Sequence, residues 1–191
     1  MKGSRSECLV LLSGGIDSAA CLTFYRDRNL SVGGVFVDYG QPPGDRERAS
    51  ARAVAEHYGI RLREVSCRNL VVPRGEIPGR NAFLIFAGLL SARRRPGVIA
   101  LGIHAGTPYF DCSPAFAREA GRLLGAYTNG TVALGTPFLR WTRATILSFC
   151  SARRVPIGLT WSCEVGRIKP CGRCPSCRGR EAFRAGAAEH D

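Results

Sequence analysis

No stretch of the sequence is apolar for long enough to cross a membrane. The longest candidate, residues 82–90 (AFLIFAGLL), reaches about half of the roughly 18–20 residues that a spanning helix needs. The apolar run at 8–12 is cut short by the Ser-Gly-Gly sequence at 13–15, so it lacks the longer apolar core of a signal peptide. We therefore expect a cytoplasmic protein with no membrane partner.

Lysine is nearly absent. Only Lys2 and Lys169 occur among 27 basic residues, so arginine supplies almost all of the net charge of +12. Such a charge favours an anionic partner such as ATP or RNA. It is also typical of a codon preference for arginine, with the charges spread over solvated faces. The arginines are dispersed, with one triple at 93–95, so the charge alone does not select a function.

A disulfide framework is not expected from the nine cysteines of a cytosolic chain. Four of them lie within fifteen residues, and they are Cys163, Cys171, Cys174 and Cys177. Four thiolates complete a closed tetrahedral zinc site, which is structural because no position remains for a substrate. The alternatives are an iron–sulfur cluster and free thiols. A metal would replace the apolar core that the tail from residue 160 lacks.

Segments of strand and helix length alternate along the chain. The predicted strands are 8–12, 31–40, 61–67, 98–104 and 132–138. The helices that follow the first are 45–59, 81–94, 113–127 and 142–154, of which 81–94 is nearly all apolar and is expected to be internal. This alternation predicts an α/β fold with an open, mainly parallel sheet and helices on both faces. We expect one α/β domain over 1–159 and a small zinc-binding element over 160–191, packed on it.

The segment SGGIDS at 13–18 joins the first predicted strand to the first helix. Glycines allow a tight turn, and the N–H groups at the helix start, with the hydroxyls of Ser13 and Ser18, would form an anion site. Asp17 would repel a phosphate unless a Mg²⁺ ion lay between them. The alternative is a plain strand-to-helix turn in which Asp17 caps the helix.

This segment resembles the pyrophosphate loop of the PP-loop ATP pyrophosphatases. Together with the cysteine cluster and several shorter motifs, it makes nearly the whole chain similar to the 7-cyano-7-deazaguanine synthase (QueC) family. The matching pieces, in chain order, are SGGIDS at 13–18, DYGQ at 38–41, PGRN at 78–81, G-x-H at 102–104, Asp111-Cys112, Pro137 with TRA at 142–144, TWSC at 160–163 and PCGRCPSCRGR at 170–180.

The resemblance implies an adenine nucleotide alpha hydrolase-like (PP-loop) fold, ATP with Mg²⁺, one structural Zn²⁺ per chain and a homodimer. It implies a ligase that adenylates the carboxylate of a small molecule, 7-carboxy-7-deazaguanine, and adds ammonia to give an amide. A second activation then dehydrates the amide to a nitrile. The residues implied for ATP binding are Ser13, Gly14, Gly15, Asp17, Ser18, Val37 and Asp38.

The catalytic residues that the resemblance implies are Asp17, Arg80, Asn81 and Arg143, and the substrate-binding residues are Arg80, Asn81, His104, Asp111 and Trp161. Arg80 suits a carboxylate or an α-phosphate because its planar guanidinium donates two parallel hydrogen bonds. Asn81 can pair with a purine-like edge. Each also has a plain structural alternative, such as a helix cap for Asn81 or Asp111 and a core position for Trp161.

The chain departs from the family pattern at several positions. Pro42-Pro43 replaces polar residues, Arg143 replaces a lysine, Thr145 replaces an acid and Glu164 replaces an aromatic residue. These changes leave the ATP motif intact but put the nitrile product in question. A paralogue with the same adenylation chemistry could join the carboxylate to another amine, including one on a protein. A further alternative is a non-catalytic or RNA-binding zinc ribbon, although the SGGIDS loop would have no purpose in a pure binder. A tRNA-modifying PP-loop enzyme is the last alternative, but no appended RNA-binding domain fits in 191 residues, so we do not expect a nucleic-acid partner.

Overall fold

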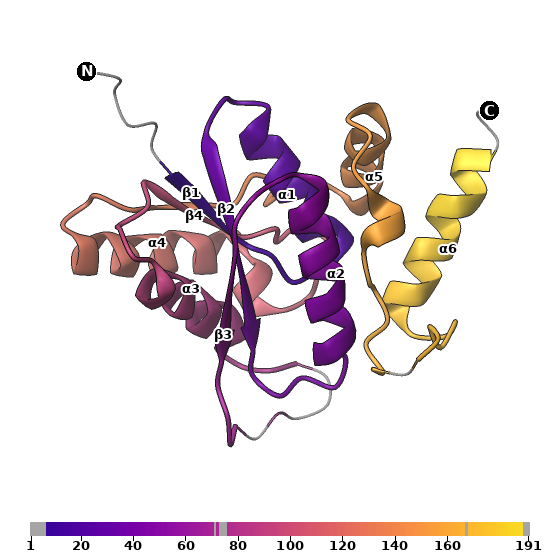
Figure 1. Cartoon of the computed structure of the whole chain (residues 1–191), viewed down its shortest axis with the longest axis horizontal. Coiled ribbons are helices and arrows are strands. Elements are labelled where there is room, and N and C mark those ends of the chain that lie inside the picture. Colours follow the sequence, from indigo (N-terminus) through magenta and orange to yellow (C-terminus); the bar gives the residue numbers. More distant parts are fainter. Residues whose placement is uncertain (1–6, 71, 73–75, 167, 189–191) are drawn as a thin grey trace.

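The computed structural model describes residues 7–70, 72, 76–166 and 168–188. Five strands form one sheet in the order β3-β2-β1-β4-β5, and every neighbouring pair is parallel (Figure 1). The strands are β1 (Glu7–Leu11), β2 (Ser31–Asp38), β3 (Leu62–Ser66), β4 (Val98–Ala100) and β5 (Ala133–Gly135). The predicted parallel α/β fold is therefore confirmed. The chain first adds β2 and β3 on one side of β1 and then adds β4 and β5 on its other side.

Helices cover both faces of the sheet. They are α1 (Ile16–Arg26), α2 (Gly44–His57), α3 (Arg80–Ser91), α4 (Pro114–Thr128), α5 (Arg143–Ala152) and α6 (Pro175–Ala188), with short 3₁₀ helices η1 (Phe110–Cys112) and η2 (Ile157–Leu159). In Figure 1, α1 and α2 lie on one side of the strands and α3 and α4 on the other. None of the helices in the described ranges is long and apolar enough to cross a membrane.

The continuous apolar run of β1 is explained by burial on both faces. Cys8 and Val10 pack with α1, α2 and α5, whereas Leu9 and Leu11 pack with α3 and α4. Successive side chains of a strand point to opposite faces, so a central strand under two helical layers needs apolar residues at every position. The central strand thereby joins the two cores.

Two predictions about helices were incomplete or wrong. The helix α3 is not internal: of its apolar side chains Ile85 is buried, whereas Leu90 is 85% exposed. The sequence analysis also did not predict α6, which begins at Pro175 inside the cysteine cluster. This helix is anchored by polar contacts, because the guanidinium of Arg180 donates to the carbonyls of Ile157 and Thr160 at 2.7 and 2.8 Å.

Candidate functional site

A cavity of about 220 Å³ opens at the carboxyl ends of β1, β2 and β4, where the strand order reverses. This is the position at which open parallel sheets bind ligands. Apolar side chains form part of its wall: Leu11, Val35, Phe36, Val37, Leu84, Leu101 and Ile103. Its polar lining groups are Ser13, Asp17, Ser18, Tyr39, Gln41, Glu47, Arg80 and Asn81. The cavity therefore combines a predicted phosphate loop with apolar walls suited to a flat ring.

The predicted phosphate loop leaves the start of α1 open to an anion. The helix is capped by Gly15, with no side-chain hydrogen bond at the cap. Asp17 lies inside the first turn, so the alternative in which it caps the helix is wrong. The Ser18 hydroxyl donates to the Gly15 carbonyl at 2.9 Å and lies 3.3 Å from the Ser13 hydroxyl. Uncapped N–H groups at a helix start attract negative charge.

The loop requires glycine at position 14 for two reasons. Gly14 has a φ of +81°, and a Cβ there would lie 2.3 Å from the Glu47 carbonyl oxygen and 2.9 Å from the Ala51 nitrogen of α2. The loop is therefore pressed against the backbone of a helix. Gly102, after β4, is similarly constrained, since a Cβ there would lie 2.7 Å from the Asp17 carbonyl oxygen.

We predict that Gly14→Ala will destabilise the protein more than Gly130→Ala. Gly130 has a similar φ of +71° but nothing within 4 Å of its Cβ position, so it reports the backbone strain alone, about 1–3 kcal/mol. Gly14→Ala adds overpacking that costs about 1–3 kcal/mol more and should also impair nucleotide binding. Urea unfolding and nucleotide titration measure the two effects, and equal behaviour of the two variants would contradict the prediction.

Two of the other predicted site residues, His104 and Arg143, lie near Asp17. His104 Nε2 lies 3.8 Å from Asp17 Oδ2, and Nδ1 of the same ring lies 2.6 Å from the Ala105 carbonyl, which only accepts hydrogen bonds. Burial raises the pKa of the Asp17 carboxyl, while the charges of His104 and Arg143 act to lower it. Arg143, at the start of α5, has a buried Nε without a hydrogen-bond partner among the described residues. His104 and Arg143 therefore lie near Asp17, although Asp17 is the one of the three that lines the cavity.

Arg80 and Asn81 line the cavity from the start of α3. Gly79, with a φ of +78°, turns the chain into this helix. The Asn81 side-chain amide donates to the Asp111 carbonyl at 2.9 Å, and the Asn81 backbone N–H donates to the Asp111 carboxylate at 3.3 Å. Asp111 is buried at the end of this contact and is not among the cavity-lining residues. Its substrate-binding role remains a prediction, and its contacts are those of a helix-anchoring acid.

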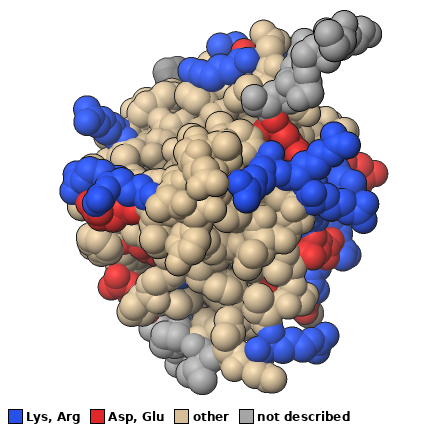
Figure 2. All heavy atoms as spheres, turned by 90° about the vertical axis from the view of Figure 1, so that its left-hand side faces the viewer, with Lys and Arg blue, Asp and Glu red and all other residues tan. Residues whose placement is uncertain are grey.

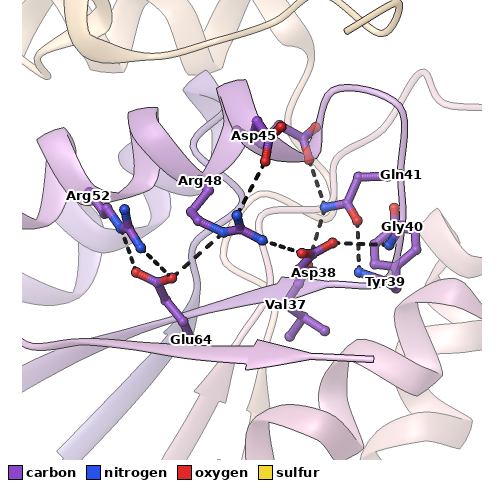
Figure 3. A network of polar contacts seen from close by, with 10 residues as sticks. Val37, Asp38, Tyr39, Gly40, Gln41, Asp45, Arg48, Arg52 and Glu64 are labelled. Atoms are coloured by element: carbon purple, nitrogen blue, oxygen red, sulfur yellow. Dashed lines mark hydrogen bonds and ion pairs between the residues drawn. The ribbon is translucent and has the colours of Figure 1, made fainter. Parts of the chain in front are cut away.

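Of the two residues predicted at the end of β2, Val37 lines the cavity and Asp38 does not. The Asp38 carboxylate pairs with Arg48 of α2 and accepts the Gly40 N–H at 3.1 Å (Figure 3). Arg48 also lies 3.7 Å from Glu64 of β3. This network ties α2 to the end of β2 and to the middle of β3, so it holds the turn that follows β2.

Trp161 supports the phosphate loop from outside the cavity. Its backbone N–H donates to the Gly14 carbonyl at 2.9 Å, and its indole N–H donates to the Cys163 carbonyl at 2.8 Å. The guanidinium of Arg46 lies 5.8 Å from the indole ring centre. The tryptophan therefore connects the loop to the first cysteine of the cluster, and it is not one of the cavity-lining residues.

The four clustered cysteines are arranged for a metal. Their Sγ atoms lie within 4.8 Å of one another, close to the roughly 3.8 Å between sulfurs that a tetrahedral site with Zn–S bonds of about 2.3 Å requires. Backbone N–H groups of Cys171, Cys174 and Cys177 each donate to the Sγ of the preceding cysteine of the set at 3.4 Å. Such bonds stabilise negative sulfur.

The thiols of this cluster differ in pKa, and a bound cation would stabilise their deprotonated forms. Backbone N–H groups of Arg173 and Cys174 lower the pKa of the Cys171 thiol to about 6. Burial and the neighbouring sulfurs raise the pKa of the Cys177 thiol to about 12. Four deprotonated sulfurs at this spacing would repel one another, and a bound positive ion would offset that repulsion.

Comparison with known proteins identifies relatives along almost the whole chain. The family model described as queuosine biosynthesis protein QueC matches residues 7–72 and 64–186. The chain is 31% identical to the 7-cyano-7-deazaguanine synthase of Synechococcus sp. (strain RCC307), covering 93% of each chain. It is 32% identical to that of Methanoculleus marisnigri, covering 93% of this chain and 94% of the relative.

Solved structures with a similar fold are more distant. U34-tRNA thiolase NcsA from Methanococcus maripaludis, with its 4Fe-4S cluster, has a TM-score of 0.50 at 15% identity, over 97% of this chain and 66% of that one. A predicted subunit of tRNA methyltransferase from Methanocaldococcus jannaschii has a TM-score of 0.50 at 13% identity, over 77% and 76% of the two chains. At these identities the likeness concerns the fold alone.

Proposed function

Because the chain belongs to the family of the queuosine biosynthesis protein QueC, we propose that it is an ATP-dependent carbon–nitrogen ligase that converts 7-carboxy-7-deazaguanine and ammonia to 7-cyano-7-deazaguanine. The observation that carries the proposal is the shared cavity, which is lined by Ser13, Asp17 and Ser18 of the loop and by Arg80 and Asn81 of α3. A nucleotide and a carboxylate can therefore meet there.

In this proposal the loop binds the β and γ phosphates of ATP. The open N–H groups at the start of α1 would donate to the phosphate oxygens. The hydroxyls of Ser13 and Ser18 bond within the loop in this structure and would turn to the phosphates when ATP binds. Asp17 would hold the Mg²⁺ that accompanies ATP, which explains a carboxylate in a phosphate site. Val37 and the other apolar side chains at the strand ends would contact the base.

The reaction proceeds through two adenylations. An oxygen of the substrate carboxylate, oriented by Arg80, attacks the α-phosphorus and pyrophosphate leaves. Ammonia then attacks the activated carbon and AMP leaves, which gives the amide. A second ATP activates the amide oxygen, and loss of AMP with two protons gives the nitrile. Arg143 supplies positive charge near the loop, and the Nε2 of His104 is the candidate proton acceptor, because Nδ1 donates to the Ala105 carbonyl.

Product analysis tests this function directly. The purified protein is incubated with ATP, Mg²⁺, 7-carboxy-7-deazaguanine and ammonia, and the products are identified by mass spectrometry. We expect the nitrile together with AMP and pyrophosphate. An amide or an amine conjugate as the final product would instead support the paralogue. Absence of AMP and pyrophosphate with every carboxylate tested would support a binding module.

The Pro42-Pro43 departure does not by itself favour the paralogue. Neither proline is among the cavity-lining residues. A Cβ at Gly166 would lie 2.1 Å from the Pro42 carbonyl oxygen. The turn at Pro42-Pro43 therefore packs against the segment between Cys163 and Cys171, the first two cysteines of the cluster. Thr145, another of the departures, donates its backbone N–H to the capping hydroxyl of Thr142. The altered residues thus have structural contacts away from the cavity wall.

We also propose that the cysteine cluster holds one structural Zn²⁺ per chain. Support comes from the four-sulfur donor set, the N–H groups directed at the sulfurs and the absence of an open ligand position. Metal analysis should find one zinc per chain, whereas iron with acid-labile sulfide would identify the alternative cluster. All nine cysteines are unpaired, which supports a reducing, cytoplasmic location.

A homodimer is the assembly that we propose for this chain. Figure 2 looks onto the side where α3 and α4 lie and shows a broad uncharged surface with charged residues toward its edges. Leu90 of α3 and Tyr127 of α4 are 85% and 69% exposed, and the ring of Tyr127 contacts that of Phe86 at 5.7 Å between centroids. An exposed apolar face of two helices suits a self-complementary interface.

We predict that Leu90→Asp will convert the dimer to a monomer at micromolar concentration. A charge at the centre of an apolar interface loses its hydration without gaining a partner, which weakens association about tenfold or more. Sedimentation velocity measures the change. Ile168→Asp is the control, because Ile168 is 80% exposed in the C-terminal tail. A monomeric wild type, or an unaffected Leu90 variant, would contradict the proposed interface.

A further inference from the structure

Glu47 of α2 lines the cavity but has no place in the roles described so far. Its carboxyl is partly buried, and the same cavity wall contains Arg80 and Tyr39. A buried carboxylate is costly unless its oxygens accept hydrogen bonds. The partners of this side chain therefore indicate what it does.

Gln41 fixes one side of the Glu47 carboxylate. The Tyr39 backbone N–H donates to Gln41 Oε1 at 2.9 Å, which identifies the oxygen of this amide (Figure 3). The amide nitrogen must then face the other way, where it donates to the Val37 carbonyl at 3.2 Å and to Glu47 Oε2 at 3.0 Å. All of the amide is used, so Gln41 anchors the carboxylate and has no remaining donor for a ligand.

Among the described residues, the Glu47 carboxylate accepts its side-chain hydrogen bond through Oε2, so Oε1 is left for a ligand or solvent at the cavity wall. The charge of Arg80 and the Gln41 bond act to lower the pKa of Glu47, but burial outweighs them and raises it. Glu47 is thus incompletely satisfied by the protein itself, at a wall of the cavity that the proposed function assigns to a nucleotide and a deazapurine.

The surroundings define what could complete this site. Leu11, Val35 and Leu101 offer apolar surface to a flat ring. A carboxylate oxygen only accepts hydrogen bonds, so its partner must present N–H groups. An exocyclic amino group on a purine-like ring meets both requirements, and both proposed ligands have one: adenine at its 6-position and the deazaguanine at its 2-position.

We propose that Glu47 is a specificity-determining residue whose carboxylate, oriented by Gln41, accepts a hydrogen bond from the exocyclic amino group of a purine-like ring in the cavity. The proposal rests on the proposed function for the identity of the two rings. It adds a base-reading residue that lies on α2, apart from the loop and from the arginine–asparagine pair of α3.

The test compares ligands that differ only in the amino group. Binding is measured by calorimetry for ATP and for purine ribonucleoside triphosphate, which has hydrogen at the 6-position. It is also measured for 7-carboxy-7-deazaguanine and its analogue without the 2-amino group. In the wild type, one of these pairs should differ about 10- to 100-fold in affinity, as expected for a hydrogen bond to a charged group. The pair that differs identifies which ring Glu47 reads.

Two variants assign that difference to Glu47. Glu47→Gln should weaken the amino-bearing ligand about 10- to 100-fold while changing the amino-free ligand about twofold or less, because its amide turns a donor toward the ring. Asp45→Asn, on the same helical turn with a 97% exposed side chain, removes the same charge and should change neither. Thermal melting checks that both variants are folded.

Failure of this proposal can be told apart from failure of the proposed function. If the wild type discriminates within neither pair, or if Glu47→Gln weakens both members of a pair equally, the proposal is overturned whatever the enzyme produces. If an amino-dependent loss is found while product analysis shows no nitrile, the base-reading role stands and only the proposed reaction fails.

Discussion

Replacing Asp17 with asparagine should lower the rate of pyrophosphate release from ATP by about 10³-fold or more. Asparagine keeps the size of the side chain but cannot hold a divalent cation against the phosphates. His104 Nε2, 3.8 Å away, and the Arg143 charge would remain in position. A coupled pyrophosphate assay measures the loss, and the corresponding control is Asp27→Asn at the far end of α1, where Asp27 pairs with Arg153.

The same variant should not lose stability at neutral pH. Burial raises the folded-state pKa of Asp17 above its usual value, so the folded protein binds this proton more tightly than the unfolded chain does. The stabilisation is complete below the unfolded pKa and is lost as the pH rises through the folded one. At pH 7 the charged carboxylate is therefore a cost, which asparagine removes. Retained turnover, or marked destabilisation at pH 7, would contradict the assigned role.

Disabling the cysteine cluster should have the second large effect. Cys163→Ser, or removal of the metal by a chelator, is expected to cost at least about 3 kcal/mol and to lower the melting midpoint by roughly 6–12 °C. The effect should extend to nucleotide affinity, because Trp161 donates to the Gly14 carbonyl and the segment at Gly166 packs on Pro42. Differential scanning calorimetry and nucleotide titration measure the two losses.

The helix α6 makes this coupling more direct. A Cβ at Gly179 would lie 2.9 Å from the guanidinium of Arg143, so the helix packs closely on a predicted catalytic residue. Faster tryptic cleavage between residues 173 and 180 would report release of the helix. Cys67→Ser, outside the cluster, is the control. Normal nucleotide affinity in a metal-free protein would contradict the coupling between the cluster and the loop.

The fold and the loop could be predicted because their signals are local. The apolar run of β1 indicates burial on both faces, and the glycines directly after it indicate a tight backbone turn. The parallel sheet needed only the alternation with helices and the preference of parallel sheets for burial on both faces, whereas the order of its strands was not predicted. The Cys163–Cys177 cluster was equally readable from its spacing.

The remaining features depend on contacts between distant segments. Glu47 resembles any charged residue of α2, and its place in the cavity emerges only once Gln41 and Arg80 are brought beside it. Leu90 was expected to be buried because its helix is nearly all apolar, but the sequence does not show which neighbour would cover it. Asp111 and Trp161 were predicted to contact substrate or to have structural positions, and that choice stays a prediction. Their contacts with Asn81 and Gly14 were not predicted, because the sequence does not identify these partners.

The hydrogen bond between Trp161 and Gly14 has a consequence for how the protein folds during its synthesis. The loop at 13–18 leaves the exit tunnel long before Trp161, whose backbone N–H donates to the Gly14 carbonyl. The nascent chain therefore carries this loop without that hydrogen bond until Trp161 has emerged. If the cluster holds the proposed zinc, the loop would reach its braced form only after Cys177 has emerged and the ion is bound, so maturation would depend on the metal supply of the cell.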